Sequence, residues 1–279
     1  MKSSYEGRLA KTNNPVNLKL IMEKDLHVLH PLSDTELLNI DKYIHDMRKS
    51  LKSISAVLLF YKVQLDQGQF TSLKPLIKSL AKQYAVLREP YVYLQTFNKI
   101  EKELQDFNES NLNELRNQLE LNYNSIVKEY LNSKKSVQFG NETIINIKEG
   151  INQININIEP KFLKKRLSKS YQKVEKLFKK LNIKSSPDEY HKLRKYCKYI
   201  YFQQVMLNNI GVEETSKQNK KLFKLTEYLG NEHDLELFYQ YLKIHFFELS
   251  HITQTYFRSK IKKLRKKVVS QFPLVNYLK

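Results

Sequence analysis

Apolar residues recur along most of this chain every three to four positions, which is the period of an amphipathic α-helix. In the first half, the period predicts one long helix over 34–67, capped by Ser33 or Asp34 and ended by Gly68. Further helices are expected at about 71–84, 90–107, 111–133, 161–182, 187–209, 213–229, 231–249 and 251–270. Proline, which the first turn of a helix tolerates, falls near four of the predicted starts, at Pro75, Pro90, Pro160 and Pro187.

The pattern changes between the two helical series. Isoleucine alternates with Asn, Gln, Thr and Lys over residues 136–160, and the run from Ile154 to Ile158 has the two-residue period of a β-strand. One or two short strands are marginally stable alone and would have to pack against helices. The sequence therefore predicts a short extended, β-like connector here.

The pattern divides the chain into four parts, namely an irregular polar segment over 1–20, a first helical bundle over 21–135, the connector over 136–160 and a second bundle over 161–279. Glycine and proline are scarce, at 6 and 7 of 279 residues, which favours helices over a turn-rich β fold. Hydrophobic residues make up 41% of the chain, enough for a sizeable core. We therefore expect an all-α fold.

The charge is strongly basic and unevenly distributed. Lys and Arg number 48 against 29 Asp and Glu, a net charge of +19, of which residues 1–139 contribute +4 and residues 140–279 contribute +15. Such an excess implies an acidic partner, for example nucleic acid, polyphosphate or an anionic membrane surface.

Cys197 is the single cysteine, which excludes an internal disulfide and a cysteine-based zinc site and fits a reducing cytoplasm. The first residues contain no apolar leader, and the most apolar short run, 56–61, is far below the ~20 residues of a membrane span. We expect a cytoplasmic protein without a membrane span.

The strongest chemical signal is a duplicated His-x-x-Arg-Lys-x-x-Lys pattern. It occurs as His45, Arg48, Lys49 and Lys52, and again 146 residues later as His191, Arg194, Lys195 and Lys198. These offsets place each set on one strip of a helix. The neighbouring apolar residues match as well, as Ile44 with Tyr190, Met47 with Leu193, Leu51 with Cys197 and Ile54 with Ile200. Each copy therefore predicts a helix with one buried and one basic side, and the guanidinium forks and ammonium groups of such strips suit phosphate oxygens.

These strips and the segments that follow them resemble the CHAD family, helical domains named for conserved histidines and known to bind inorganic polyphosphate. The likeness covers about residues 20–270. The run Leu229-Gly230-Asn231-Glu232-His233-Asp234-Leu235 looks like the family's Leu-Gly-x-x-x-Asp turn. The corresponding run of the first half is Tyr84-Ala85-Val86-Leu87-Arg88-Glu89-Pro90, in which Ala85 and Glu89 depart from the family and Arg88 stands where its basic residue would be. The spacing agrees, with 43 residues from His45 to Arg88 and 42 from His191 to His233.

The resemblance implies two pseudo-symmetric four-helix bundles whose basic helices line a shared central groove or pore. Polyphosphate would lie along that groove, held by the residues of the two strips and by Arg88. We expect binding without catalysis and without a cofactor, and polyphosphate granules are a candidate location.

Two more basic helices could extend this track. Lysines follow one face of 161–182, among them Lys165, Lys169 and Lys173, and the last helix carries Arg258, Lys262 and Arg265. Either helix could instead lie on an anionic membrane, and a solvated basic face is as well supported for each.

Two other functions stay open. A polyphosphate-processing or triphosphate-hydrolysing enzyme would need clustered carboxylates or a Gly-rich phosphate loop, and neither pattern is present in the sequence. A nonspecific nucleic-acid-binding protein could use the same charge, yet most of the aromatic residues fall at apolar helix positions and are expected in the core.

The remaining histidines carry weaker signals. His27 and His30 have helical spacing without a third nearby ligand, so we expect no metal site there. The pair His233-Asp234 is expected to be structural, with Gly230 ending one helix and Asn231 capping the next.

Overall fold

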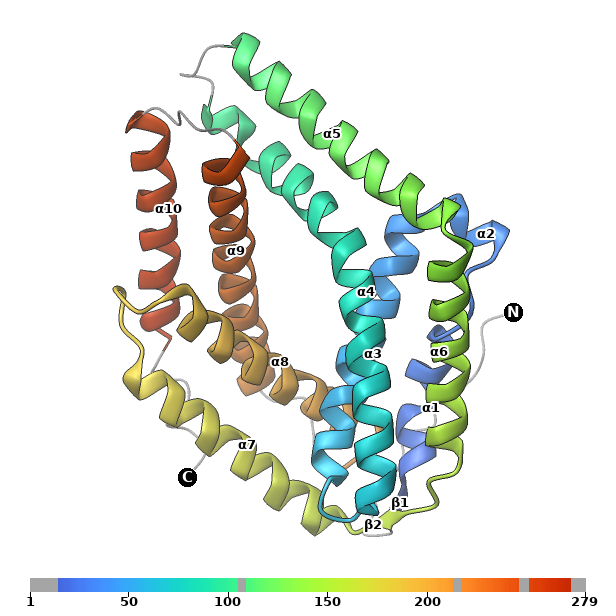
Figure 1. The fold of residues 1–279 in the computed structure, drawn as a ribbon. Helices are drawn as coiled ribbons and strands as arrows, with labels where there is room; N and C mark the ends of the chain where they lie inside the picture. Colours follow the sequence, from blue (N-terminus) through green and yellow to red (C-terminus); the bar gives the residue numbers. More distant parts are fainter. Residues whose placement is uncertain (1–14, 105–108, 213–216, 246–250, 272–279) are drawn as a thin grey trace, which may run out of the picture.

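The computed structural model describes residues 15–104, 109–212, 217–245 and 251–271. These ranges contain ten α-helices, one short 3-10 helix and two strands of two residues each, which confirms the predicted all-α fold (Figure 1). The first half contains β1 (Val16–Asn17), α1 (Leu18–Val28), α2 (Asp34–Leu37), α3 (Ile40–Tyr61), α4 (Gln67–Ile100), η1 (Glu101–Leu104), α5 (Glu109–Asn132) and α6 (Lys134–Asn152). The second half contains β2 (Asn157–Ile158), α7 (Pro160–Lys180), α8 (Pro187–Asn209), α9 (Lys217–His245) and α10 (His251–Val269).

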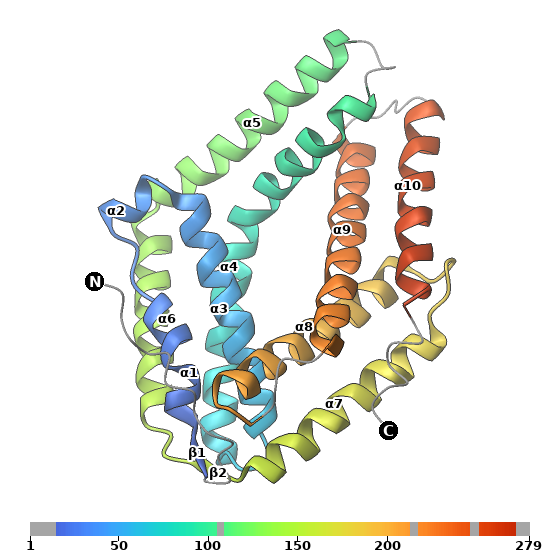
Figure 2. The same cartoon turned by 180° about the vertical axis from the view of Figure 1, so that it is seen from behind.

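The two halves are joined through the helices that carry the duplicated strips. In the first half, α3 packs against α1 and α4, and α4 packs against α5 and α6. In the second half, α8 packs against α7 and α9, and α9 packs against α10. The direct contact of α3 with α8 links the halves, and a contact of α4 with α9 links them again (Figures 1 and 2). The basic helices therefore meet near the centre of the molecule.

The predicted break between 71–84 and 90–107 is wrong, because α4 runs without interruption through Pro75 and Pro90. A proline inside a helix costs about 3 kcal/mol through one lost hydrogen bond and a steric clash. The buried residues Ile77, Leu80, Tyr84 and Leu87 bind the stretch between the two prolines to the core, and this burial outweighs that cost.

The predicted single helix over 34–67 is divided into α2 and α3. Ser33 forms a capping box with Glu36, but this cap begins only the four-residue helix α2. The cap of α3 is Asn39, whose side chain accepts from the Lys42 amide. Gly68 is not a stop, since it lies in the first turn of α4.

The second predicted break, between 213–229 and 231–249, is also wrong for the described residues. Helix α9 continues through Gly230, where an added Cβ would meet no atom within 4 Å. Gly230 therefore does not end a helix and Asn231 does not cap one, so the structural interpretation of His233-Asp234 as part of a cap fails. Residues 213–216 and 246–249 of these two predicted helices lie outside the described residues.

The predicted extended connector is mostly helical. Residues Lys134–Asn152 form α6, in which Ile144, Ile147 and Ile151 are buried at the helical spacing of three and four positions. Only Asn157–Ile158 forms a strand, which pairs antiparallel with β1 in the segment that was expected to be irregular. Because isoleucine suits both periods, tertiary burial decided between them. The limits of the two bundles stay a prediction.

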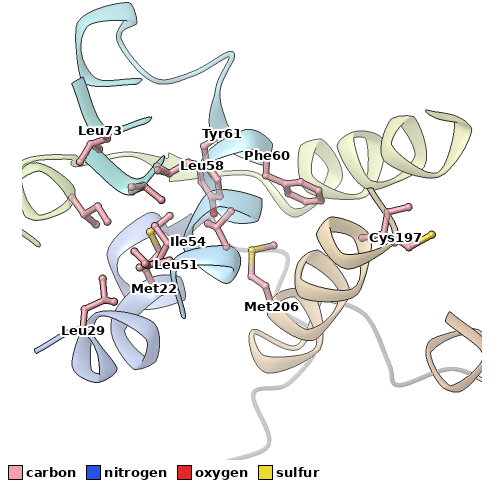
Figure 3. Packing of buried hydrophobic residues seen from close by; sticks show 14 of the residues in the cluster. Met22, Leu29, Leu51, Ile54, Leu58, Phe60, Tyr61, Leu73, Cys197 and Met206 are labelled. Carbon is pink, nitrogen blue, oxygen red and sulfur yellow. The ribbon is translucent and has the colours of Figure 1, made fainter. Parts of the chain in front are cut away.

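One hydrophobic core extends across both halves. It contains Met22 of α1, Leu51 and Ile54 of α3, and Cys197 and Met206 of α8 (Figure 3). The four apolar pairs that match between the two strips are all at most 1% exposed, so the predicted core register is confirmed. A second, smaller core contains Phe97 near the C-terminal end of α4, Phe238 of α9 and Phe257 of α10. This packing fixes α3 and α8 relative to each other.

Candidate functional site: a basic cavity between the two halves

The two strips meet at a cavity of about 430 Å³, which we call the central cavity. Four helices line it: α3 with His45, Arg48, Lys49 and Lys52, α4 with Ala85, Arg88, Glu89 and Val92, α8 with Arg194, Lys198, Tyr201 and Phe202, and α9 with Phe223, Glu227, His233, Asp234 and Leu237. Seven of the sequence-predicted residues are therefore brought together. The similar spacings, 43 residues from His45 to Arg88 and 42 from His191 to His233, also have a structural meaning, because Arg88 and His233 both line this cavity from the middle of a helix.

The other predicted residues lie elsewhere. His191 does not line the central cavity. Its ring centroid lies 4.7 Å from that of His233, which does line it. Lys195 and Lys173 line a different cavity. Lys165 and Lys169 are exposed on α7, and Arg258 and Lys262 are exposed on α10.

Arg265 is committed to ion pairs within the fold. Its Nε lies 2.7 Å from Glu232 Oε1 and its Nη2 lies 3.2 Å from Glu236 Oε2. Its Nη1 donates to the Ser185 carbonyl over 3.1 Å, and its guanidinium lies 4.6 Å from the ring centroid of Tyr190. The arrangement ties α10 to α9 and to the start of α8, so the structure gives Arg265 a stabilising role away from the central cavity.

Four cations of the central cavity, namely Arg48, Lys52, Arg194 and Lys198, are largely desolvated, and neighbouring cations repel three of them, Arg48, Lys52 and Lys198. Burial, followed by the charges of Arg48, Arg194 and Lys198, lowers the pKa of Lys52 to about 7. Burial likewise lowers the pKa of Arg194 and of Lys198. Within the described residues, the buried Nε of Arg194 has no hydrogen-bond partner. Buried donors of this kind favour an anion that would pair with them.

Three carboxylates offset part of this charge. Glu89, Glu227 and Asp234 line the same cavity, and burial raises the pKa of Asp234 against the opposing effect of Arg194. Asp234 is not among the residues predicted for the site, although its position in the run after the second strip is a signal for it.

The histidines near the cavity favour the neutral form in the free protein. Partial burial lowers the pKa of both His45 and His191, with Arg88 the next cause for His45 and Arg194 for His191. Burial and Arg194 lower the pKa of His233 to about 3. A bound polyanion would oppose these shifts by favouring the imidazolium.

The sequence predicts neither a metal site at His27 and His30 nor a membrane span. In the structure, His30 Nε2 lies 3.8 Å from Glu36 Oε1 in a polar cavity that His27 also lines. Among the described residues, no three or more His, Cys, Asp or Glu side chains are grouped so that they could hold a metal ion. In the same part of the chain, every helix is too short or too polar to cross a membrane.

The fold and the cavity define an all-helical protein in which a duplicated basic helix faces its own copy. The model of the CHAD domain matches residues 24–243, and the chain belongs to this family. PptA from Streptomyces chartreusis has a similar solved structure, with a TM-score of 0.64 at 11% identity over 94% of this chain and 95% of that one. The CHAD domain from the plant Ricinus communis is similar too, with a TM-score of 0.63 at 14% identity over 98% and 97% of the two chains. At these identities the likeness shows the fold alone, and no curated protein sequence matches the chain.

Proposed function

We propose that this protein binds inorganic polyphosphate along the central cavity. The observation that carries the proposal is the meeting of the two strips, because it places Arg48, Lys49 and Lys52 opposite Arg194 and Lys198 around one space. A linear chain of phosphates carries charge at close, regular intervals and offers oxygens to guanidinium and ammonium donors from every side. Family membership favours the same ligand.

The proposal is for binding without catalysis. It is supported by the sequence, which has no Gly-rich phosphate loop and no clustered carboxylates of the kind that hold magnesium. Incubating long-chain polyphosphate with the protein and Mg²⁺ or Mn²⁺ should leave the chain length unchanged on a gel. Release of phosphate or shortening of the chain would favour a polyphosphate-processing enzyme instead.

Competition between polyanions tests the proposed ligand directly. Labelled long-chain polyphosphate should bind with a log K that falls linearly with log salt, because several phosphates release counterions together. Single-stranded or duplex DNA, added at the same phosphate concentration, should displace it poorly, since bases and sugars would have to enter the same cavity. Equal displacement by DNA would support nonspecific nucleic-acid binding. A binding constant independent of salt would contradict a polyanion site.

We expect the affinity to depend on pH in two separate ranges. The pKa of Lys52 is about 7 in the free protein, so a bound polyanion that raises this pKa causes proton uptake above pH 7. Affinity should therefore increase as the pH falls from about 9 to about 7. The pKa values of His45 and His191 lie below 6.5, and their proton uptake on binding should strengthen affinity further below pH 7.

Two variants separate these contributions. Lys52→Met should remove most of the dependence above pH 7, and His45→Gln combined with His191→Gln should remove most of that below pH 7. Calorimetry in buffers of different ionisation enthalpy measures the protons taken up in each case. Wild-type protein that takes up no protons on binding at pH 6.5 and at pH 8 would show that these groups do not respond to the ligand.

A further inference from the structure

A second cavity, of about 490 Å³, adjoins the central cavity at Lys52, which lines both. It is formed by α3, α4, α7 and α8, and we call it the α7-side cavity. Its lining residues are Leu51, Lys52, Ser55, Leu58, Leu59, Phe70, Lys74, Ile77, Lys78, Ala81, Lys173, Lys195, Tyr196 and Tyr199. Lys52 and Lys195 belong to the two strips, whereas the other three lysines and the aromatic residues of the lining do not.

The lining of the α7-side cavity consists mainly of buried apolar residues and exposed lysines. Its apolar residues are mostly buried, among them Leu51, Leu58, Phe70 and Ile77. Four of its five lysines are exposed and therefore stand at the opening, namely Lys74, Lys78, Lys173 and Lys195. The central cavity contains three carboxylates, whereas the α7-side cavity is lined by none. The site thus combines an apolar floor, formed by these buried residues, with a cationic rim, formed by the four exposed lysines, and no lining carboxylate balances the charge of this rim.

A bare phosphate chain does not match this floor, because burying charged oxygens against leucine and isoleucine side chains would remove hydration without replacing it. An alkyl chain matches it well, since each methylene removed from water strengthens binding about fourfold. The rim then has a separate function, which is to hold an anion at the end of that chain.

The aromatic side chains favour an alkyl group over a nucleobase. Lys173 Nζ lies 4.3 Å from the ring centroid of Tyr196, and Lys74 Nζ lies 5.7 Å from that of Phe70. Lys195 Nζ lies 6.0 Å from the ring centroid of Tyr199. Ammonium groups thus occupy positions over rings on which a base would stack.

We propose that the α7-side cavity binds an alkyl phosphate, with the alkyl chain on the floor between α3 and α4 and the phosphate among the rim lysines. A phosphate monoester dianion can accept hydrogen bonds from several lysines at once. The proposal does not depend on polyphosphate binding in the central cavity, and the two are tested by different variants.

Titration calorimetry of the full chain with decyl phosphate, kept below its critical micelle concentration, tests the site. Ser55→Leu fills the cavity from α3, and it suits this helix because the Ser55 hydroxyl donates only one turn back, to the Leu51 carbonyl. We expect it to weaken decyl phosphate binding about tenfold or more. Ser72→Leu, an exposed position of α4 outside the cavity, is the matched control and should leave the affinity unchanged. Equal affinities in wild type and Ser55→Leu would overturn the proposal.

The phosphate and the rim are tested separately. Replacing Lys74 and Lys195 by Ala should weaken decyl phosphate binding about tenfold, whereas the same change at the exposed Lys82 and Lys192, which lie outside the cavity on α4 and α8, should not. Decanol and inorganic phosphate should each bind at least about tenfold more weakly than decyl phosphate.

Two further outcomes would contradict the proposal. One is decyl phosphate binding that is lost in Lys49→Glu/Lys198→Glu, a variant of the central cavity, but is kept in Ser55→Leu. The other is binding to anionic lipid vesicles without binding to monomeric decyl phosphate, which would indicate a membrane-facing surface.

Discussion

Reversing Lys49 and Lys198 to Glu should weaken long-chain polyphosphate binding at least ~100-fold. Both residues line the central cavity, one from α3 and one from α8. Each substitution removes a charge-assisted contact of about 1.5–3 kcal/mol and adds a repelling charge. Fluorescence anisotropy with labelled polyphosphate measures the loss, and circular dichroism checks that the helices are intact. This is the most direct test that the two halves hold one ligand.

The single reversals and a matched pair make the test specific. Lys49→Glu and Lys198→Glu should each weaken binding, because the ligand contacts both helices. Lys42 and Lys192 are exposed on the same two helices outside the central cavity, so reversing them together changes the net charge equally. This control should lower affinity only a few-fold, through the long-range field. Equal losses in the two double variants would mean that total charge, and not the cavity, determines affinity.

Local signals predicted helix limits well where they agreed with tertiary packing. The expected helix 187–209 matches α8, because Ser186 and Glu189 form a capping box and Pro187 occupies the first turn. The same signals failed at Pro75, Pro90 and Gly230, all of which lie inside helices. There the apolar stripe on both sides of the supposed break is held against other helices, and a local cost of a few kcal/mol does not end the element.

The candidate site was predictable to the extent that it is repeated in the sequence. Duplication identified the two strips, and their matched apolar neighbours fixed which side of each helix is buried. The contribution of Glu227 was not predictable, because it reaches the cavity only through the packing of α9 on α8 and α4. Asp234 stands in the run after the second strip, but its place in the cavity depends on the same packing. The lowered pKa of Lys52 could not be predicted either, since it arises from burial between the two halves.

The ion pairs of Arg265 could not be predicted from the sequence either. In the sequence it belongs to a run of cations in the last helix, which suggested a ligand contact. Its ion-pair partners Glu232 and Glu236 are 33 and 29 residues away in the chain and become neighbours only when α10 packs on α9. Glu232 is 2% exposed, so its carboxylate depends on Arg265 for compensation.

Arg265→Ala should therefore lower the free energy of unfolding by about 3–5 kcal/mol, because it leaves a buried carboxylate without its partner. Urea denaturation followed by circular dichroism measures this loss. Lys262→Ala, an exposed change one turn earlier in α10, should alter stability by less than about 0.5 kcal/mol. Replacing Arg265 and Glu232 together by Leu should recover part of the loss, since no unpaired charge then remains at position 232. Polyphosphate affinity of the folded Arg265→Ala protein should be close to that of the wild type. Weakened binding at unchanged stability would instead return Arg265 to the ligand-binding surface.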